Sequence, residues 1–576
     1  MQPVASPNGR TTLPANPTPS KLNSFNKELR KASQRLCLTT SLSILNTYSN
    51  TRVAWLVSFF YLFTFFHQKK RPRYNTWRVP TAEVRFFLLL CILICDTPHG
   101  NSPHTVSIHI LDDDSLLNIF HLYRPAIFDG DEALDLHIAG GKKWDRERWW
   151  YKLAQVCQRW RILILASATH LGLCLVCTYG TPVADMLSHS PPLPLIIDYF
   201  HYYPNITAED EEAIILALEQ RHRVRRVRLG LPLPKLQKLI MVIDEEYPVL
   251  EYLVMEPPIE DKGSALMLPE TLQAPHLRHA SLIGFLLPTR FRLLTTAMGL
   301  VMLCLHIEHP SAYFPPNTLL HWLSSMPQLE MLLIRFRFPV PNRDVERQLM
   351  HTPIVTHVTL PNLRSLTFQG VSAYVEAVVR QITTPRLKKL LVYFYKQLTF
   401  SVPRLLQFVN TTENFRINGA KIKFFRETVY VGMFSRGQAE KYDFFINVTS
   451  RHLDWQVSSV AQIFNSLGQL FSTVEVLILK HEVHSQSSEE HNEVDRTEWR
   501  KILRWFSNVK TLCLYGGLVQ ELSRCLRLDD GELPLGLLPE LQMLKYSGID
   551  DTGDAFKSFV DARQNAGRPV TLVRSS

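Results

Sequence analysis

The hydrophobic pattern of the second half of the chain repeats a short unit. Each unit has an apolar residue, two more polar positions and then alternating apolar residues, as in Leu363-Arg-Ser-Leu366-Thr-Phe368. The ten units are 224–229, 250–255, 277–282, 300–305, 329–334, 363–368, 387–392, 474–479, 509–514 and 541–546. Alternation predicts one short strand per unit with its apolar side chains inward. Segments 317–325 and 374–382 are expected to form helices behind the strands.

The flanking segments are more varied. Segments 171–178 and 193–199 are predicted to be two strands, with a polar turn opening at Thr181-Pro182 between them. Acidic residues at the start of 208–221 indicate a helix. The repeat is lost over residues 395–470, and 555–566 is expected to be a closing helix.

A helical pattern precedes the repeats. Trp149, Leu153, Val156 and Trp160 recur at steps of four, three and four, which predicts one helix over 148–161 with a single apolar stripe. Segment 111–120 predicts a second helix, capped by Asp114 or Ser115. Two such short helices bury too little surface to fold alone, so they indicate a docking module. Docking requires that part of the stripe stays exposed.

These helices resemble an F-box, in the form common among fungal F-box proteins. The family pattern runs Leu-Pro-x-Glu/Asp-x-Leu-Leu-x-Ile-Phe and then Leu-x-x-Val-Cys/Ser-x-x-Trp. The matching residues are Leu111, Leu116, Leu117, Ile119, Phe120, Leu153, Val156, Cys157 and Trp160. Asp112 stands where the family usually has proline, and an insert over 123–147 separates the helices.

The repeated unit resembles a degenerate leucine-rich repeat, whose core is Leu-x-x-Leu-x-Leu. The spacing between units is irregular, and the asparagine that follows the strand in the family is missing. The expected fold is therefore α/β: a short helical F-box module followed by an irregular leucine-rich-repeat-like solenoid with a curved parallel sheet. The predicted divisions are a leader over 1–100, the module over 101–170 and the repeat domain over 171–576.

The resemblance implies a function without bond chemistry. The nine matching residues would form the core of the module or its surface toward a Skp-type adaptor, and through it the protein would join a cullin-based SCF ubiquitin ligase. The repeat face would hold a substrate protein, whose identity no motif names. The alternative is a repeat scaffold without a ubiquitin role, tethered to a membrane through Val53 to Phe66.

Charge and composition narrow these alternatives. The chain has 576 residues and a net charge of +10. Residues 1–80 hold twelve Lys or Arg and one acid, so they carry +11 and the remainder sums to −1. A near-neutral folded part argues against nucleic-acid binding. Residues 1–50 are read as disordered, and the apolar runs 53–66 and 86–95 are shorter than a membrane span.

The candidate chemistry is sparse. Cys174 and Cys177 lie in an apolar run without a second zinc-spaced pair, which predicts buried thiols and an intracellular protein of the cytoplasm or nucleus. His481-Glu482-Val483-His484 has its second histidine one residue early for a zinc motif and is read as a solvated loop. With no nucleophile spaced from a base, the sequence predicts no enzyme activity, cofactor or metal.

Overall fold

The structure is a computed structural model that describes much of the chain from residue 111 onward. The described residues are 111–124, 147–200, 206–258, 266–337, 357–394, 402–412, 415, 417–435, 442–450, 452–482, 496–528, 533, 535–547 and 555–574. The predicted disordered leader, the run Val53 to Phe66 and most of the 123–147 insert lie outside them.

The described residues form an α/β fold around one sixteen-stranded sheet, in the order β1-β2-β3-β4-β6-β8-β9-β11-β13-β16-β15-β14-β17-β18-β19-β20. Its strands are β1 Leu175–Cys177, β2 Leu195–Phe200, β3 Val224–Gly230, β4 Tyr252–Met255, β6 His279–Ile283, β8 Met302–Ile307, β9 Met331–Phe336, β11 Ser365–Gly370, β13 Lys389–Phe394, β14 Gly419–Phe424, β15 Thr428–Phe434, β16 Phe444–Thr449, β17 Val476–His481, β18 Thr511–Tyr515, β19 Met543–Ser547 and β20 Thr571–Arg574. Two small sheets pair β5 Leu266–Met267 with β7 Phe285–Leu286, and β10 Val358–Thr359 with β12 Ile382–Thr383.

All ten predicted units contain a strand of the large sheet, so their strand prediction is confirmed. The unit at 363–368 shows the reason. Leu363 is buried just before β11, and Leu366 and Phe368 are buried within it. Leu366 lies in register with Leu332 of β9 and Leu390 of β13, so equivalent positions of neighbouring units stack into one core.

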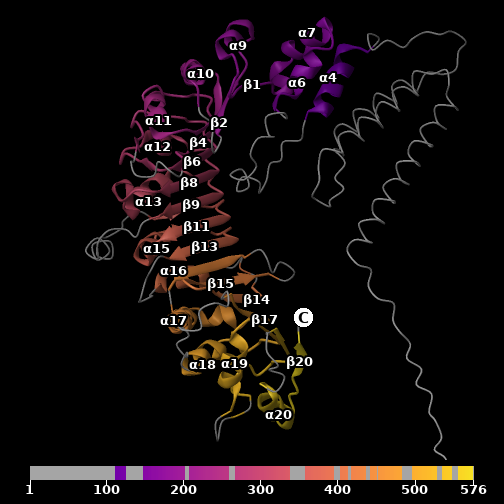
Figure 1. Cartoon of the computed structure of the whole chain (residues 1–576). Helices are drawn as coiled ribbons and strands as arrows, with labels where there is room; N and C mark the ends of the chain where they lie inside the picture. The colour runs from indigo at the N-terminus through magenta and orange to yellow at the C-terminus, as the bar shows by residue number, and fades with distance from the viewer. Residues whose placement is uncertain are drawn as a thin grey trace, which may run out of the picture. The chain divides into compact units, whose positions relative to one another are not determined.

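Among the described helices, four precede β1, and the others lie in connections between the strands. They are α4 Asp113–Tyr123, α6 Trp149–Ala154, α7 Gln158–Ala166, α8 Ala168–Leu171, α9 Val183–His189, α10 Ala208–Glu219, α11 Leu233–Ile240, α12 Arg292–Thr296, α13 Pro316–Ser324, α15 Ser372–Val379, α16 Pro403–Asn410, α17 Leu453–Phe471, α18 Arg496–Arg504, α19 Leu518–Leu526 and α20 Lys557–Asn565, with a 3-10 turn η5 at Pro310–Ala312. Figure 1 shows α11, α12, α13, α15 and α16 along one side of the strands. Helices α13 and α15 confirm the two predicted for this side.

The sheet is not parallel throughout, which corrects the predicted parallel sheet. Strand β15 runs antiparallel to both β14 and β16. On their other sides, β14 pairs in parallel with β17, and β16 pairs in parallel with β13. The link from β14 to β15 is a tight turn in which the Phe425 amide donates to the Thr428 carbonyl at 2.8 Å. So short a link cannot carry the crossover that a parallel pair needs. This hairpin lies in the stretch where the repeat is lost.

The first strand and the last helix also differ from expectation. Segment 171–178 is not one strand: α8 ends at Leu171, Gly172 adopts φ +61° as its C-cap, and β1 begins only at Leu175. A helix, α9, follows Thr181-Pro182 where only a polar turn was expected. Helix α20 forms but does not close the domain. Strand β20 follows it and pairs in parallel with β19, with Leu572 beside Leu544.

One hydrophobic core runs through the described residues from Leu116 in α4 to Val570 before β20. The helices and the inward positions of the strands contribute to it together. The predicted boundary near residue 170 therefore separates elements that share a core, and it stays a prediction. Within the described part of the chain, no helix combines the length and the apolar character that crossing a membrane requires.

Candidate docking module

The predicted helix over 148–161 is two helices, α6 and α7. The chain turns at Gln155 and Val156, and Cys157 is extended, with φ −157° and ψ 170°, as the N-cap of α7. Trp160 consequently lies on a different helix from Trp149 and Leu153, and the predicted single stripe is wrong. A periodicity of apolar residues cannot reveal a break that falls between two turns of helix.

The cap of α4 is Asp112, two residues before Asp114 and three before Ser115. Its Oδ1 accepts a hydrogen bond from the Ser115 amide at 2.7 Å, and its Oδ2 accepts one from the Ser115 hydroxyl at 3.0 Å. The prediction of Asp114 or Ser115 as the cap is wrong because the helix already begins at Asp113. The bonds from Ser115 hold the pKa of Asp112 below its ordinary value of 3.8. The residue that departs from the F-box pattern thus has a defined local role.

The interior of the module is filled by its own large side chains. Leu116, Phe120 and Ile164 are fully buried, and the rings of Phe120 and Trp160 pack edge to face with centroids 4.9 Å apart. Trp160 is only 5% exposed. It is a core residue of the module. Among the predicted residues, those buried in this way are Leu116, Ile119, Phe120, Leu153 and Trp160.

An apolar seam remains at the junction of the helices. Arg159 Nη2 donates to the Leu111 carbonyl at 2.6 Å and to Asp113 Oδ1 at 2.7 Å, which ties the start of α4 to the start of α7. Val156 and Cys157 lie at that start. Leu111 and Cys157 are half-buried, and Val156 is 58% exposed. We call Leu111, Val156 and Cys157 the apolar seam.

Further apolar residues of the same helices reach solvent. Leu117 and Leu122 are on α4 and Ile162 is on α7; the first is half-buried and the other two are exposed. Single exposed apolar residues are ordinary on a protein surface, and those of this module lie on α4, on α7 and at the junction before α7.

Helix α6 fastens the module to the edge of the sheet. Trp150 is buried, and its indole Nε1 donates to the Cys174 carbonyl at 3.2 Å. Arg148 donates to the Val176 carbonyl at 3.3 Å, and Glu147 pairs with Arg226 of β3 at 3.0 Å. Sequence reasoning assigned no role to Trp150. The sequence did contain a signal for it: Trp149, Trp150 and Tyr151 are consecutive aromatic residues, and three consecutive side chains cannot all face one side of a single helix.

The cysteine and histidine candidates are structural. Cys174 and Cys177 are buried, as predicted, and burial raises the pKa of the Cys177 thiol to about 12. His481 is a buried residue at the end of β17, inward like Leu479, so the predicted solvated loop is wrong at this residue. His484 lies outside the described residues. No group of metal-binding side chains occurs in the described ranges.

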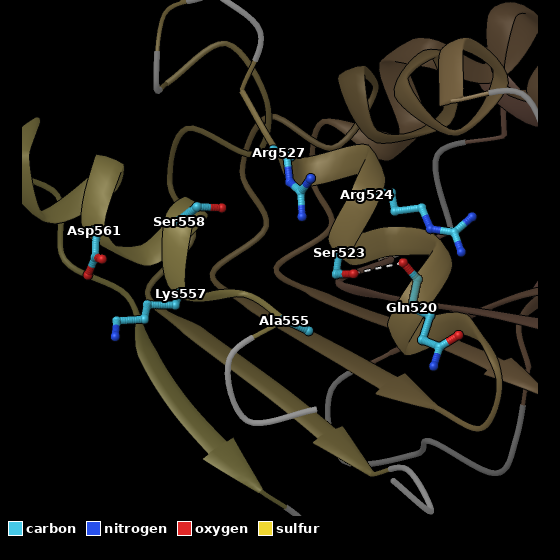
Figure 2. Close-up of a pocket in the computed structure, with 8 residues that line it drawn as sticks. All are labelled: Gln520, Ser523, Arg524, Arg527, Ala555, Lys557, Ser558 and Asp561. Atoms are coloured by element: carbon cyan, nitrogen blue, oxygen red, sulfur yellow. Dashed lines mark hydrogen bonds between the residues drawn. The ribbon is translucent and has the colours of Figure 1, made fainter. Parts of the chain in front are cut away.

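A polar cleft of about 700 Å³ lies between α19 and α20 (Figure 2). Gln520, Ser523, Arg524, Arg527, Ala555, Lys557, Ser558 and Asp561 line it. Its three cations and its one carboxylate, Asp561, are all solvent-exposed. Water therefore competes for each of them, and no pair of side chains in the cleft joins a nucleophile to a base.

No protein family matches this sequence, and no curated protein shows significant similarity to it. The resemblance to F-box and leucine-rich-repeat proteins therefore rests on the residues that carry it. The fold around those residues is a small helical module, with an apolar seam, attached to the edge of a large α/β sheet.

Proposed function

We propose that this protein is an F-box-type adaptor. Its module of α4, α6 and α7 docks on a Skp-type adaptor and so joins a cullin-based SCF ubiquitin ligase. The sheet region is an irregular leucine-rich-repeat-like solenoid that holds a substrate protein. The protein makes and breaks no bonds; it raises the effective concentration of substrate lysines near the ubiquitin-carrying enzyme.

The observation that carries the docking half is the apolar seam. Phe120, Trp160 and their neighbours already fill the interior of the module. The exposure of Val156 is therefore not the result of a poorly packed core. Covering exposed apolar surface contributes roughly 25 cal/mol per Å². A partner that seats an apolar residue against Leu111, Val156 and Cys157 would gain this free energy.

The solenoid half is supported by the regular stacking of the units. Each of the ten predicted units supplies one strand, and neighbouring strands pair at equivalent positions, as Leu332, Leu366 and Leu390 do. One strand per unit with helices in the connections is the arrangement that a leucine-rich repeat implies. A sheet built this way presents a long row of side chains on the side away from the helices.

Val156→Asp tests the docking half. We expect the full-length variant to lose at least about tenfold in affinity for a purified Skp-type adaptor, because a carboxylate would be buried against an apolar surface. The measurement is co-purification followed by calorimetric titration. Val156 is exposed, so the fold should be kept, which circular dichroism would verify.

Met298→Asp is the matched control, because Met298 is also an exposed apolar residue but lies before β8 in the sheet region. It should bind the adaptor like the wild type. If wild type and both variants bind the adaptor equally, or none of them binds, the F-box proposal is wrong, and a repeat scaffold without a ubiquitin role takes its place.

A further inference from the structure

The face of the sheet away from the helices carries a group of aromatic rings on β13, β16 and β15. Val392, Ile446 and Val431 of these strands are buried in the core, so the adjacent residues Tyr393, Phe445 and Tyr430 face the other way. Strand pairing brings the three together: the Tyr393 and Phe445 ring centroids are 5.2 Å apart, and those of Tyr430 and Phe445 are 5.4 Å apart.

A glycine makes room for a fourth ring. The Tyr442 ring centroid lies 5.4 Å from that of Phe445, and the ring occupies the space above Gly432 of β15. A Cβ at Gly432 would come within 2.3 Å of Tyr442 Cε1, so only glycine allows this approach. We call Tyr393, Tyr430, Tyr442 and Phe445 the aromatic cluster. Phe445 is 6% exposed, and the three tyrosines are half-buried.

Lysines follow the cluster on the next two strands. Lys421 and Lys423 of β14 lie in register with Gly432 and Tyr430 of β15, and Lys480 of β17 lies in register with Lys423. Glu482, just after β17, pairs with Lys480 at 2.7 Å. The bond from Lys480, then the charges of Lys423 and Lys421, lower the pKa of Glu482. All three lysines therefore act on a carboxylate placed here.

We infer that this face binds an acidic segment of a partner protein, whose apolar or aromatic side chain packs on the aromatic cluster while its carboxylates lie over Lys421, Lys423 and Lys480. The chain itself places the carboxylate of Glu482 in this field. Three lysines against that one carboxylate leave a net positive charge, which complements an acidic partner. Aromatic rings at the centre and charges at the side are the arrangement of a protein-binding surface. The identification of this segment as part of a ubiquitylation substrate rests on the proposed function. The binding of an acidic segment to this face does not depend on it.

The same chemistry fits nucleic acid less well. A nucleic-acid site needs a track of cations along the phosphate backbone, whereas these lysines occupy two adjacent strands, about 5 Å apart.

Selection from a random-peptide display library against the full-length protein tests the inference. We expect the recovered peptides to be enriched in Asp and Glu together with an aromatic or apolar residue. One such peptide, labelled with a fluorophore, should bind with an affinity that falls as salt rises. Its Kd should increase at least about tenfold in Lys421→Glu/Lys423→Glu, because the reversed charges repel its carboxylates.

Arg524→Glu/Lys557→Glu is the control, since it makes the same change of charge at the cleft of Figure 2 and should leave the Kd unchanged. Tyr430→Ser, which keeps every charge, should weaken binding without removing its salt dependence. Three results would each overturn the inference. The first is recovery of peptides without acidic residues, and the second is equal binding of the peptide by both double variants. The third is tighter binding of a poly-uridine oligonucleotide, if the lysine variant abolishes it. The apolar seam is not involved, so Val156→Asp should bind the peptide normally, which separates this outcome from that of the adaptor test.

Discussion

The helical module and the sheet differ in how far neighbours in the sequence decide the structure. Each of the ten repeated strands has apolar residues that alternate as the unit predicts, and repeated strands that adjoin one another pair at equivalent positions. The module joins α4 to α7 across an insert, and its contacts are made by residues such as Phe120 and Trp160 that are far apart in the chain. Local pattern is therefore a good guide to the sheet and a poor one to the module.

Trp160→Ala should have the largest effect and should separate the two regions. Removing a buried tryptophan costs about 3–5 kcal/mol, because the lost ring leaves a cavity beside Phe120. We expect hydrogen exchange, measured by mass spectrometry, to accelerate in α4 and α7 while β8, β9 and β11 keep their protection. Equal acceleration in those strands would show that the module and the sheet unfold as one unit, which would contradict the distinction drawn between the two regions.

Arg563→Leu tests the opposite end of the sheet. Arg563 of α20 is fully buried, and its guanidinium donates to the carbonyls of Leu538, Pro539 and Leu541 at 3.0 to 3.1 Å. The substitution removes these three hydrogen bonds, and among the described residues only the Leu538 carbonyl keeps a further donor, the Leu541 amide, so we expect a loss of about 2–4 kcal/mol. The readout is chemical denaturation together with exchange in β19 and β20. Because β19 pairs only with β18 and β20 in the described sheet, the loss of protection should fade toward β17.

Asp112→Ala should have the smallest effect, confined to the first turn of α4. The alanine removes both bonds to Ser115, so we expect a lower thermal midpoint for the module. The folded pKa of Asp112 is below its ordinary value of 3.8, so its contribution is present above that pH and is lost as the pH falls through the depressed pKa. Asp112→Asn, which keeps a cap without a charge, should restore the midpoint but remove this pH dependence. A midpoint that is unchanged in the alanine variant would show that the cap does not stabilise α4.

Some of the candidate site could be predicted and some could not. Leu111 lies just before α4, and the other eight residues of the F-box pattern lie on α4, α6 and α7 and at the junction between the last two. The pattern could not distinguish the buried Trp160 from the exposed Val156. The spacing of the apolar residues placed Trp160 and Val156 on one stripe of one helix. Cys157 breaks that helix, and Phe120 then covers the tryptophan ring. The aromatic cluster was missed because Tyr393, Tyr430 and Phe445 come from three strands, and register alone unites them.

The sequence by itself determined where the ten repeated strands lie and which of their side chains enter the main core. Alternation within six residues is enough for that, because a strand directs successive side chains to opposite faces. Only the tertiary structure decided that β15 runs antiparallel, that α6 fastens the module to β1, and that four rings meet beside three lysines. These features depend on pairing and packing between distant segments, and no local periodicity records which segments meet.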